Sequence, residues 1–309
     1  MILCVSPNAA IDRIIVVPDF KPFEVNRATS AVDAAGGKGV NAARAIKNLR
    51  GDVVCAGFLA GESGRRVVQL AKATGLEGEW TWIDGETRTC TIVVDPHSGR
   101  STVVNESGPT VTVENWKQLQ RDVLVVAAGA ECICVCGSAP PGTQEAFYAD
   151  FLRGLQQLSI PIWVDASGMT LRAAVAVPGV GIKVNHEEIG ALVGRPIENA
   201  QDALEVAQTL RKGGANMVIV TLGASGAVIA HEDGQWWAKP PTIRAVSGVG
   251  SGDSFTAGFA VAATNGETMP EALRWAAAAG AANALSIGPG QFEYADFERI
   301  LAETTVVSL

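Results

Sequence analysis

Three closely spaced glycines and one acid in the C-terminal part of the chain have types and spacing that suit chemistry. The segment SGVGSGDSFTAGFA places Gly248, Gly250 and Gly252 directly before Asp253 and a helical pattern. Glycines let backbone N–H groups crowd together, and a helix N-terminus adds free N–H groups and a positive dipole end, so the turn forms an anion hole. An acid there would repel a bound anion. The conflict is resolved if Asp253 accepts the proton of a hydroxyl while the amides stabilise a transferred phosphoryl group.

Two other phosphate-binding patterns do not fit this turn. Walker A requires GxxxxGK[ST], and the pair Gly37-Lys38 is followed by glycine. The dinucleotide fingerprint GxGxxG follows a first strand, whereas this GxGxG lies near residue 250. The alternative to a catalytic role is that Asp253 only caps the helix after a glycine turn.

A second glycine turn precedes another helical pattern near the N-terminus. In AAGGKGVNAARA, Gly37 and Lys38 lie in the turn and Asn41 lies on the first turn of the helix. Such a turn approaches a polyhydroxylated ligand closely, and Asn41 can bond its hydroxyls. The alternative is a tight strand-to-helix connection with an exposed lysine.

The elements that must position these turns alternate between short apolar runs and helical patterns. We expect strands within 1–7, 52–60, 131–138, 160–167, 181–186 and 216–223, and helices within 37–49, 143–158, 199–214 and 269–288. This alternation predicts an α/β fold with a parallel sheet covered on both faces, and ligands at the carboxyl ends of its strands. Period-two patterns at about 11–35 and 88–106, the second with a hairpin at 96–99, predict antiparallel strands outside the main sheet. They would form a small β lid on a single domain of residues 1–309.

Composition excludes several classes of protein. The net charge of −8 gives no basic surplus for a nucleic acid. We expect no signal peptide and no membrane span, since the N-terminal segment lacks a basic n-region and no apolar run reaches about 18 residues. Six cysteines, three of them alternating in CICVC, and three histidines predict buried reduced thiols in a cytoplasmic protein rather than a metal cage.

The two glycine motifs together resemble the signatures GGKGxNxA and GxGD of the PfkB (ribokinase-like) carbohydrate kinase family. The resemblance covers essentially the whole chain, including the expected lid. It implies a Rossmann-type core sheet flanked by helices, with a β-sheet lid, and transfer of the γ-phosphoryl group of ATP to a sugar hydroxyl. By the same resemblance Asp253 is the catalytic base, and the amides of Gly250, Ser251 and Gly252 form the anion hole.

Further segments resemble the nucleotide side of that family. KVNHEE resembles KPNxxE, which implies Mg²⁺ organised by Glu188 through water, although NHEE alone is typical of a helix cap. The implied cofactors are ATP and Mg²⁺, with K⁺ as a further candidate. The residues that the resemblance places near ATP, together with Gly250 and Gly252, are Lys183, Asn185, Thr221, Gly223, Gly226 and Asn283.

Other segments resemble the hexose-phosphate branch of the family. VVNESGP resembles NExGP and CGSAPPG matches SGSxPPG of that branch, whereas SPNAAID resembles NPxxD of the family as a whole. Arg27 and Arg88 match positions that hold the substrate's own phosphate, and Cys90 stands where the branch often has Asn. The implied substrate-binding residues are Asp12, Arg27, Gly37, Lys38, Asn41, Arg88, Asn105 and Ser138.

The identity of the substrate stays open at this point. We expect a 1-phosphofructokinase or a tagatose-6-phosphate kinase first and a 6-phosphofructokinase next. A kinase of an unphosphorylated sugar or a nucleoside is the main rival, and it predicts that Arg27 and Arg88 do not point into the site. A non-catalytic ligand-binding protein would usually lack the base. The lid predicts a homodimer, and the alternative is a monomer whose lid folds on its own core.

Overall fold

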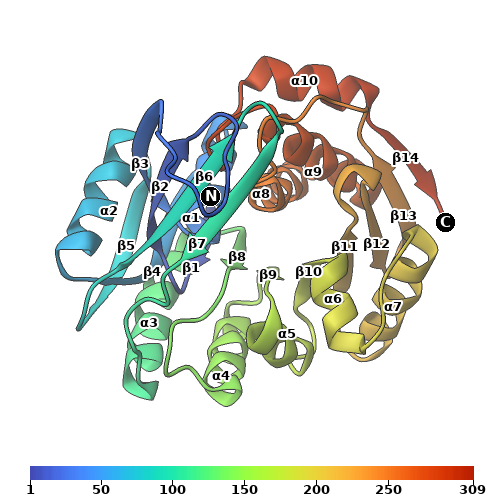
Figure 1. Cartoon of the computed structure of the whole chain (residues 1–309). Helices are drawn as coiled ribbons and strands as arrows, with labels where there is room; N and C mark the ends of the chain where they lie inside the picture. Colours follow the sequence, from blue (N-terminus) through green and yellow to red (C-terminus); the bar gives the residue numbers. More distant parts are fainter.

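The computed structural model describes residues 1–309 and contains two β-sheets. The larger sheet has ten strands and forms the core (Figure 1). Its strands are β1 Ile2–Ser6, β4 Val53–Ala60, β5 Glu77–Ile83, β8 Cys132–Cys136, β9 Ile162–Asp165, β10 Gly181–Asn185, β11 Met217–Thr221, β12 Ala227–His231, β13 Gly234–Lys239 and β14 Thr305–Ser308.

The order of the core strands is β14-β13-β12-β11-β10-β9-β8-β1-β4-β5. All pairs from β5 to β11 are parallel, and the three beyond β11 are antiparallel. The parallel sheet predicted from the alternation of strands and helices is therefore confirmed. The antiparallel extension was not predicted.

Helices cover both faces of this sheet (Figure 1). Alternate residues of β1 show why: Ile2 and Cys4 face one buried cluster, whereas Leu3 and Val5 face the other. The first face is covered by α1 Lys38–Asn48, α2 Gly61–Ala73, α8 Ser251–Thr264, α9 Met269–Asn283 and α10 Tyr294–Glu303. The second is covered by α3 Val113–Val126, α4 Glu145–Leu155, α5 Gly168–Val175, α6 His186–Val193 and α7 Ala200–Lys212.

The smaller sheet has four strands in the order β3-β2-β6-β7. They are β2 Ala10–Val16, β3 Ser30–Gly36, β6 Arg88–Asp95 and β7 Arg100–Asn105, so both period-two stretches contribute, and β6 and β7 form the predicted hairpin. One detail differs from the expectation of antiparallel strands only. β2 and β6 pair in parallel because the long connection through β3, α1, β4, α2 and β5 returns the chain to the same end of the sheet.

All six cysteines are buried and free, as expected from their apolar surroundings. The longest apolar helices fall short of what a bilayer crossing requires, so none of them qualifies as a membrane span.

Candidate active site

A cavity of about 580 Å³ lies between the small sheet and the carboxyl ends of the core strands. We call it the polar cavity and define it by Asp12, Lys38, Asn41, Arg88, Lys183 and Asp253. The predicted site residues on its wall are Asp12, Gly37, Lys38, Asn41, Arg88, Asn105, Ser138, Lys183, Asn185, Glu188, Thr221, Gly223, Gly250, Gly252 and Asp253.

The glycine turn before α8 has the geometry of an anion hole. Gly250 adopts φ 84°, and a Cβ there would come within 2.5 Å of Pro289, so only glycine fits. The N–H groups of Gly250, Gly252 and Asp253 have no acceptor within the chain, whereas Ser251 donates its N–H to the Gly248 carbonyl at 3.2 Å. Of the three amides expected to form the anion hole, those of Gly250 and Gly252 are therefore free, and that of Ser251 is already engaged.

Asp253 lies on the first turn of α8 and is 7% exposed. Its Oδ2 accepts from Asn41 Nδ2 at 3.1 Å, and no backbone N–H donates to it. The helix-cap alternative is not supported, because a capping carboxylate would accept from the backbone of its own helix.

The environment of Asp253 raises the pKa of its carboxyl group. Burial raises the pKa of Asp253 to about 6, and the negative charge of Asp165 acts in the same direction. The ammonium groups of Lys38 and Lys183 and the hydrogen bond from Asn41 lower it. A carboxylate with a pKa near neutrality is matched to the removal of a hydroxyl proton at physiological pH.

Two lysines share one buried carboxylate beside the turn. Asp165, 1% exposed at the end of β9, accepts from Lys38 Nζ at 3.1 Å and from Lys183 Nζ at 2.8 Å. Burial alone would raise the pKa of Asp165, but the two ammonium groups hold it below its usual value. Asp165 was missed in the sequence, although an acid at the carboxyl end of a predicted strand was a usable signal.

The lid side of the polar cavity carries hydrogen-bonding groups suited to a sugar. Asp12, Cys90 and Asn105 lie abreast on neighbouring strands β2, β6 and β7, and all three line the cavity. Asp12 is 4% exposed, and burial raises its pKa against the opposing effect of Arg44. The buried Oδ1 of Asn8, also on the cavity wall, has no hydrogen-bond partner, so it is an acceptor available to a ligand hydroxyl.

The two arginines expected to hold a phosphate lie in different places. Arg88 lines the polar cavity, and its guanidinium donates to the carbonyls of Asn8, at 2.9 and 3.1 Å, and Glu106, at 3.3 Å. Arg27 is exposed in the connection between β2 and β3 and does not line the cavity within a single chain. The structure therefore brings only one of them to the site.

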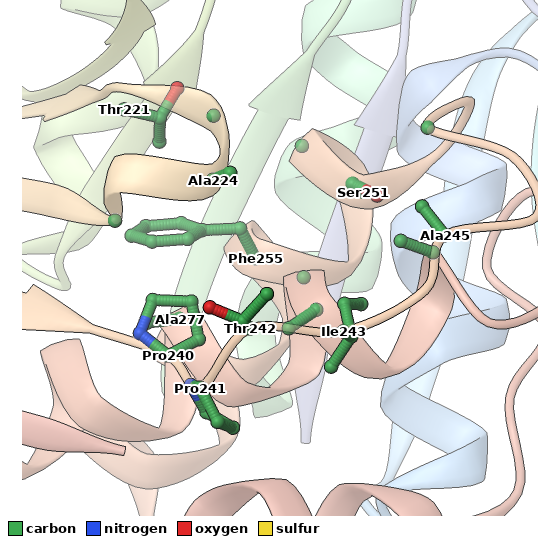
Figure 2. A pocket seen from close by; sticks show the side chains of 17 residues that line it. Thr221, Ala224, Pro240, Pro241, Thr242, Ile243, Ala245, Ser251, Phe255 and Ala277 are labelled. Carbon is green, nitrogen blue, oxygen red and sulfur yellow. The ribbon is translucent and has the colours of Figure 1, made fainter. Parts of the chain in front are cut away.

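A second, adjoining cavity of about 390 Å³ is mainly apolar. Figure 2 shows the ring of Phe255 above Pro240 and Thr242, with Ile243 and Ala245 farther along the wall. We call it the apolar cavity. It shares Thr221, Gly223 and Gly252 with the polar cavity, and Ser251 and Gly226 also line it.

Asn283 does not line either cavity, in contrast to the expectation that it borders the adenine. It is fully buried one layer behind the turn. Its Nδ2 donates to the Val249 carbonyl at 2.8 Å, and its Oδ1 accepts from Ser254 Oγ at 3.1 Å and from Gly290 N at 2.7 Å. The side chain braces the glycine turn.

Comparison with known proteins agrees with this arrangement. The family model of the pfkB family carbohydrate kinases matches residues 2–293. The chain therefore belongs to the PfkB family. It is a carbohydrate kinase, that is, a phosphotransferase whose acceptor is an alcohol group.

Individual relatives span nearly the whole chain. Tagatose-6-phosphate kinase of Staphylococcus epidermidis is 29% identical over 100% of both chains. 1-phosphofructokinase of Escherichia coli (strain K12) is 31% identical over 90% of this chain and 88% of the relative. A structure of phosphofructokinase-2 from Escherichia coli in complex with potassium is 28% identical, covers 98% of each chain and gives a TM-score of 0.89. A tetrameric inhibited form of the same enzyme gives 0.88 at 28% identity, covering 97% of this chain and 98% of that one.

Proposed function

We propose that the protein transfers the γ-phosphoryl group of Mg-ATP to a hydroxyl of a ketohexose phosphate, with Asp253 as the general base. One observation carries this proposal. The carboxylate of Asp253 lies at the glycine turn where the polar and apolar cavities meet, so one ligand on each side would bring their reacting ends to this acid. The apolar cavity suits a nucleotide base, and the polar cavity suits a sugar phosphate.

The reaction follows from the positions of these groups. The acceptor hydroxyl gives its proton to Asp253 as its oxygen forms a bond to the γ-phosphorus, and the bond from that phosphorus to the bridging oxygen of ADP breaks. The free amides of Gly252 and Asp253 stabilise the charge on the transferred group, and Lys183 lies beside this turn, its Nζ 2.9 Å from the position of a Cβ on Gly252. Holding both substrates in line supplies the rest of the rate enhancement.

The residues present fit a Mg²⁺ ion that arrives with the nucleotide. Asp165 is engaged by two lysines, Glu188 accepts from the Asn185 backbone, and no group of three or more acid, histidine or cysteine side chains is placed to hold an ion. Mg²⁺ commonly keeps several waters and binds through substrate phosphates, so Glu188 would contact it through water. The ion, when bound, neutralises charge on the β- and γ-phosphates.

We propose Arg88, with Ser138, as the site of the substrate's own phosphate, because both line the polar cavity and a guanidinium binds phosphate oxygens in a bidentate manner. The names of the relatives favour tagatose 6-phosphate or fructose 1-phosphate as acceptor, with fructose 6-phosphate next. A kinase of an unphosphorylated sugar or a nucleoside is the alternative, and the exposed position of Arg27 agrees with what that alternative predicts for this residue.

A panel of acceptors tests the proposal. ADP release with Mg-ATP is measured for fructose 1-phosphate, tagatose 6-phosphate, fructose 6-phosphate, fructose, ribose and adenosine. The proposal predicts turnover on phosphorylated ketohexoses, with the acceptor KM raised at least tenfold by Arg88→Met and unchanged by Arg100→Met, an exposed arginine on the same hairpin. Equal kcat/KM for fructose and its phosphates would refute the phosphate site.

We propose that two copies associate through the small sheet. Val32 and Val103, 60% and 42% exposed, flank Ile14 and Ile92 in one cross-strand row, and a second sheet could cover this row. A tetrameric form exists for phosphofructokinase-2 of Escherichia coli. Val32 lines neither cavity, so sedimentation of Val32→Lys as a smaller species than the wild type would support the interface, and identical sedimentation coefficients would oppose it.

Two finer points accompany the proposal. Potassium is a candidate activator, since a potassium complex exists for phosphofructokinase-2 of Escherichia coli. A comparison of the activity in K⁺ and in Na⁺ at equal ionic strength tests this.

Six free cysteines fit a reducing compartment, which supports the cytoplasm as the site of action.

A further inference from the structure

A buried arginine that the sequence analysis did not single out lies directly behind the polar cavity. Arg44 is on α1 and is 5% exposed. Its Nη1 donates to Asn41 Oδ1 at 3.0 Å and to the Pro289 carbonyl at 2.7 Å, and its Nη2 donates to the Ala35 carbonyl. Burying a guanidinium costs free energy because the charge leaves water, and the three acceptors of Arg44 offset part of that cost.

The bond from Arg44 decides which way the Asn41 amide faces. With its Oδ1 held by the guanidinium, Asn41 turns its Nδ2 toward both buried acids, at 3.3 Å from Asp12 Oδ2 and 3.1 Å from Asp253 Oδ2. The flipped amide would place its oxygen against two carboxylates and its NH₂ against a cation. One amide therefore holds both acids, and Arg44 fixes that amide.

The other bonds of Arg44 reach the small sheet and the glycine turn. Ala35 lies near the end of β3 in the small sheet. Pro289 packs against Gly250, since a Cβ on that glycine would lie 2.5 Å from Pro289 Cα. The neighbouring Gly290 donates to Asn283, the side chain that braces the turn. Arg44 thus joins the small sheet, α1 and the anion hole at one buried cation.

We propose that Arg44 is a positioning residue for phosphoryl transfer: it orients Asn41 and thereby holds Asp12 and Asp253 in a fixed relation to each other and to the glycine turn. This inference rests on the proposed function, in which Asp12 binds the acceptor and Asp253 takes its proton. Arg44 itself does not line either cavity, so it acts through Asn41.

The kinetic test uses Arg44→Lys, which keeps a cation but loses the fork that bonds three acceptors. The expected result is a kcat lower by about 10–100-fold, as for a misplaced reacting group, with the KM for ATP within about threefold of wild type. Arg50→Met is the matched control, because Arg50 follows the same helix and lies over the Tyr294 ring instead. It is expected to leave kcat unchanged.

A double-mutant cycle separates positioning from a merely structural role. In an Asn41→Ala background, Arg44→Lys is expected to lower kcat by less than about threefold, because the amide through which it acts is gone. Equal losses in both backgrounds, or a wild-type kcat in Arg44→Lys, would overturn the inference.

A readout that needs no turnover completes the test. The carboxyl ¹³C signal of Asp253, assigned with Asp253→Asn, is titrated in the wild type, Arg44→Met and Arg44→Lys. The groups that face this carboxyl are Lys38, Asn41, Asp165, Lys183 and, through Asn41, Arg44 with Asp12. Loss of a cation and of a fixed donor raises a carboxyl pKa, so the titration midpoint should move to higher pH in Arg44→Met.

The two hypotheses can fail separately. A midpoint unmoved by either substitution in folded protein overturns the role of Arg44, even if the wild type is an active kinase. If the substitutions move the midpoint of Asp253 but the wild type phosphorylates no acceptor, the coupling of Arg44 to Asp253 is supported and the proposed function is refuted. Should Arg44→Met not fold, Arg44→Lys and Asn41→Ala carry the same comparison, since each removes the fixed donor.

Discussion

Replacing Asp253 with asparagine should abolish catalysis and at the same time make the protein more stable. The buried carboxylate has a pKa of about 6, against 3.8 for an unperturbed aspartic acid. A folded-state pKa above the unfolded one means that the folded protein binds the proton more tightly. Stability is therefore lost as pH rises through this window, and the loss is complete above pH 7.

The magnitude follows from the two pKa values. Each pKa unit corresponds to about 1.36 kcal/mol, so the ionised carboxylate weakens the folded state by about 3 kcal/mol at pH 8 and by about half of that at pH 5. Asparagine has nearly the size and shape of the neutral acid. Asp253→Asn should thus raise the free energy of unfolding by up to about 3 kcal/mol at pH 8, or the Tm by roughly 5 °C for a chain of this length.

The assay is thermal unfolding of the wild type and Asp253→Asn at pH 8 and pH 5, together with kcat. The expected loss in kcat is about 10²–10⁴-fold. Asp52→Asn, at an exposed loop position, is the control and should change neither quantity. The reasoning is refuted if Asp253→Asn is less stable than the wild type at pH 8, if its gain does not shrink at pH 5, or if it keeps kcat within tenfold.

Three further outcomes are expected. The kcat/KM for the acceptor should fall about tenfold between pH 7 and pH 5, because the base of the free enzyme must be ionised, and a flat profile over this range would contradict a pKa of about 6 for Asp253. Gly250→Ala should lower both the Tm and kcat, because φ 84° and the contact with Pro289 exclude a Cβ, whereas Gly129→Ala, with open space around it, should change neither in the same melting and rate assays. Ala281→Leu should fill the apolar cavity and raise the KM for ATP at least tenfold while the acceptor KM stays within about twofold, and a reversed pattern in steady-state kinetics would mean that the nucleotide lies elsewhere.

Local signals in the sequence predicted much of the fold. The apolar runs that became β8 to β11 are short, rich in Ile and Val, and buried except at Asn185 and Thr221. The helical pattern of α1 has one apolar face, so periodicity alone sufficed for these elements. The glycine turns were equally visible, because a positive φ such as that of Gly250 restricts the residue type. The parallel pairing of β2 with β6 was not predictable in this way, since strands about 70 residues apart pair through tertiary packing.

Site residues were predicted where the residue type within a motif indicates the role. They were missed where the role depends only on a tertiary contact. Arg44 gains its role from Asn41, Pro289 and Ala35, so its local sequence does not mark it. Asp165 stands at the carboxyl end of a strand, which is a local signal, but its pairing with Lys38, 127 residues away, is a tertiary contact. Asn283 was expected at the adenine and instead braces the glycine turn, because its helix position faces the core. Arg27 lies on an exposed connection outside the polar cavity, a position that the match of its residue type did not predict.

The most direct test of the central claim follows the phosphorus atoms. Wild type and Asp253→Asn are incubated with Mg-ATP and each ketohexose phosphate, and the products are identified by ³¹P NMR. We expect the wild type to form ADP and a ketohexose bisphosphate in equal amounts, and Asp253→Asn to form neither at a comparable rate. Release of inorganic phosphate regardless of the acceptor, or bisphosphate formation by Asp253→Asn at the wild-type rate, would contradict the central claim.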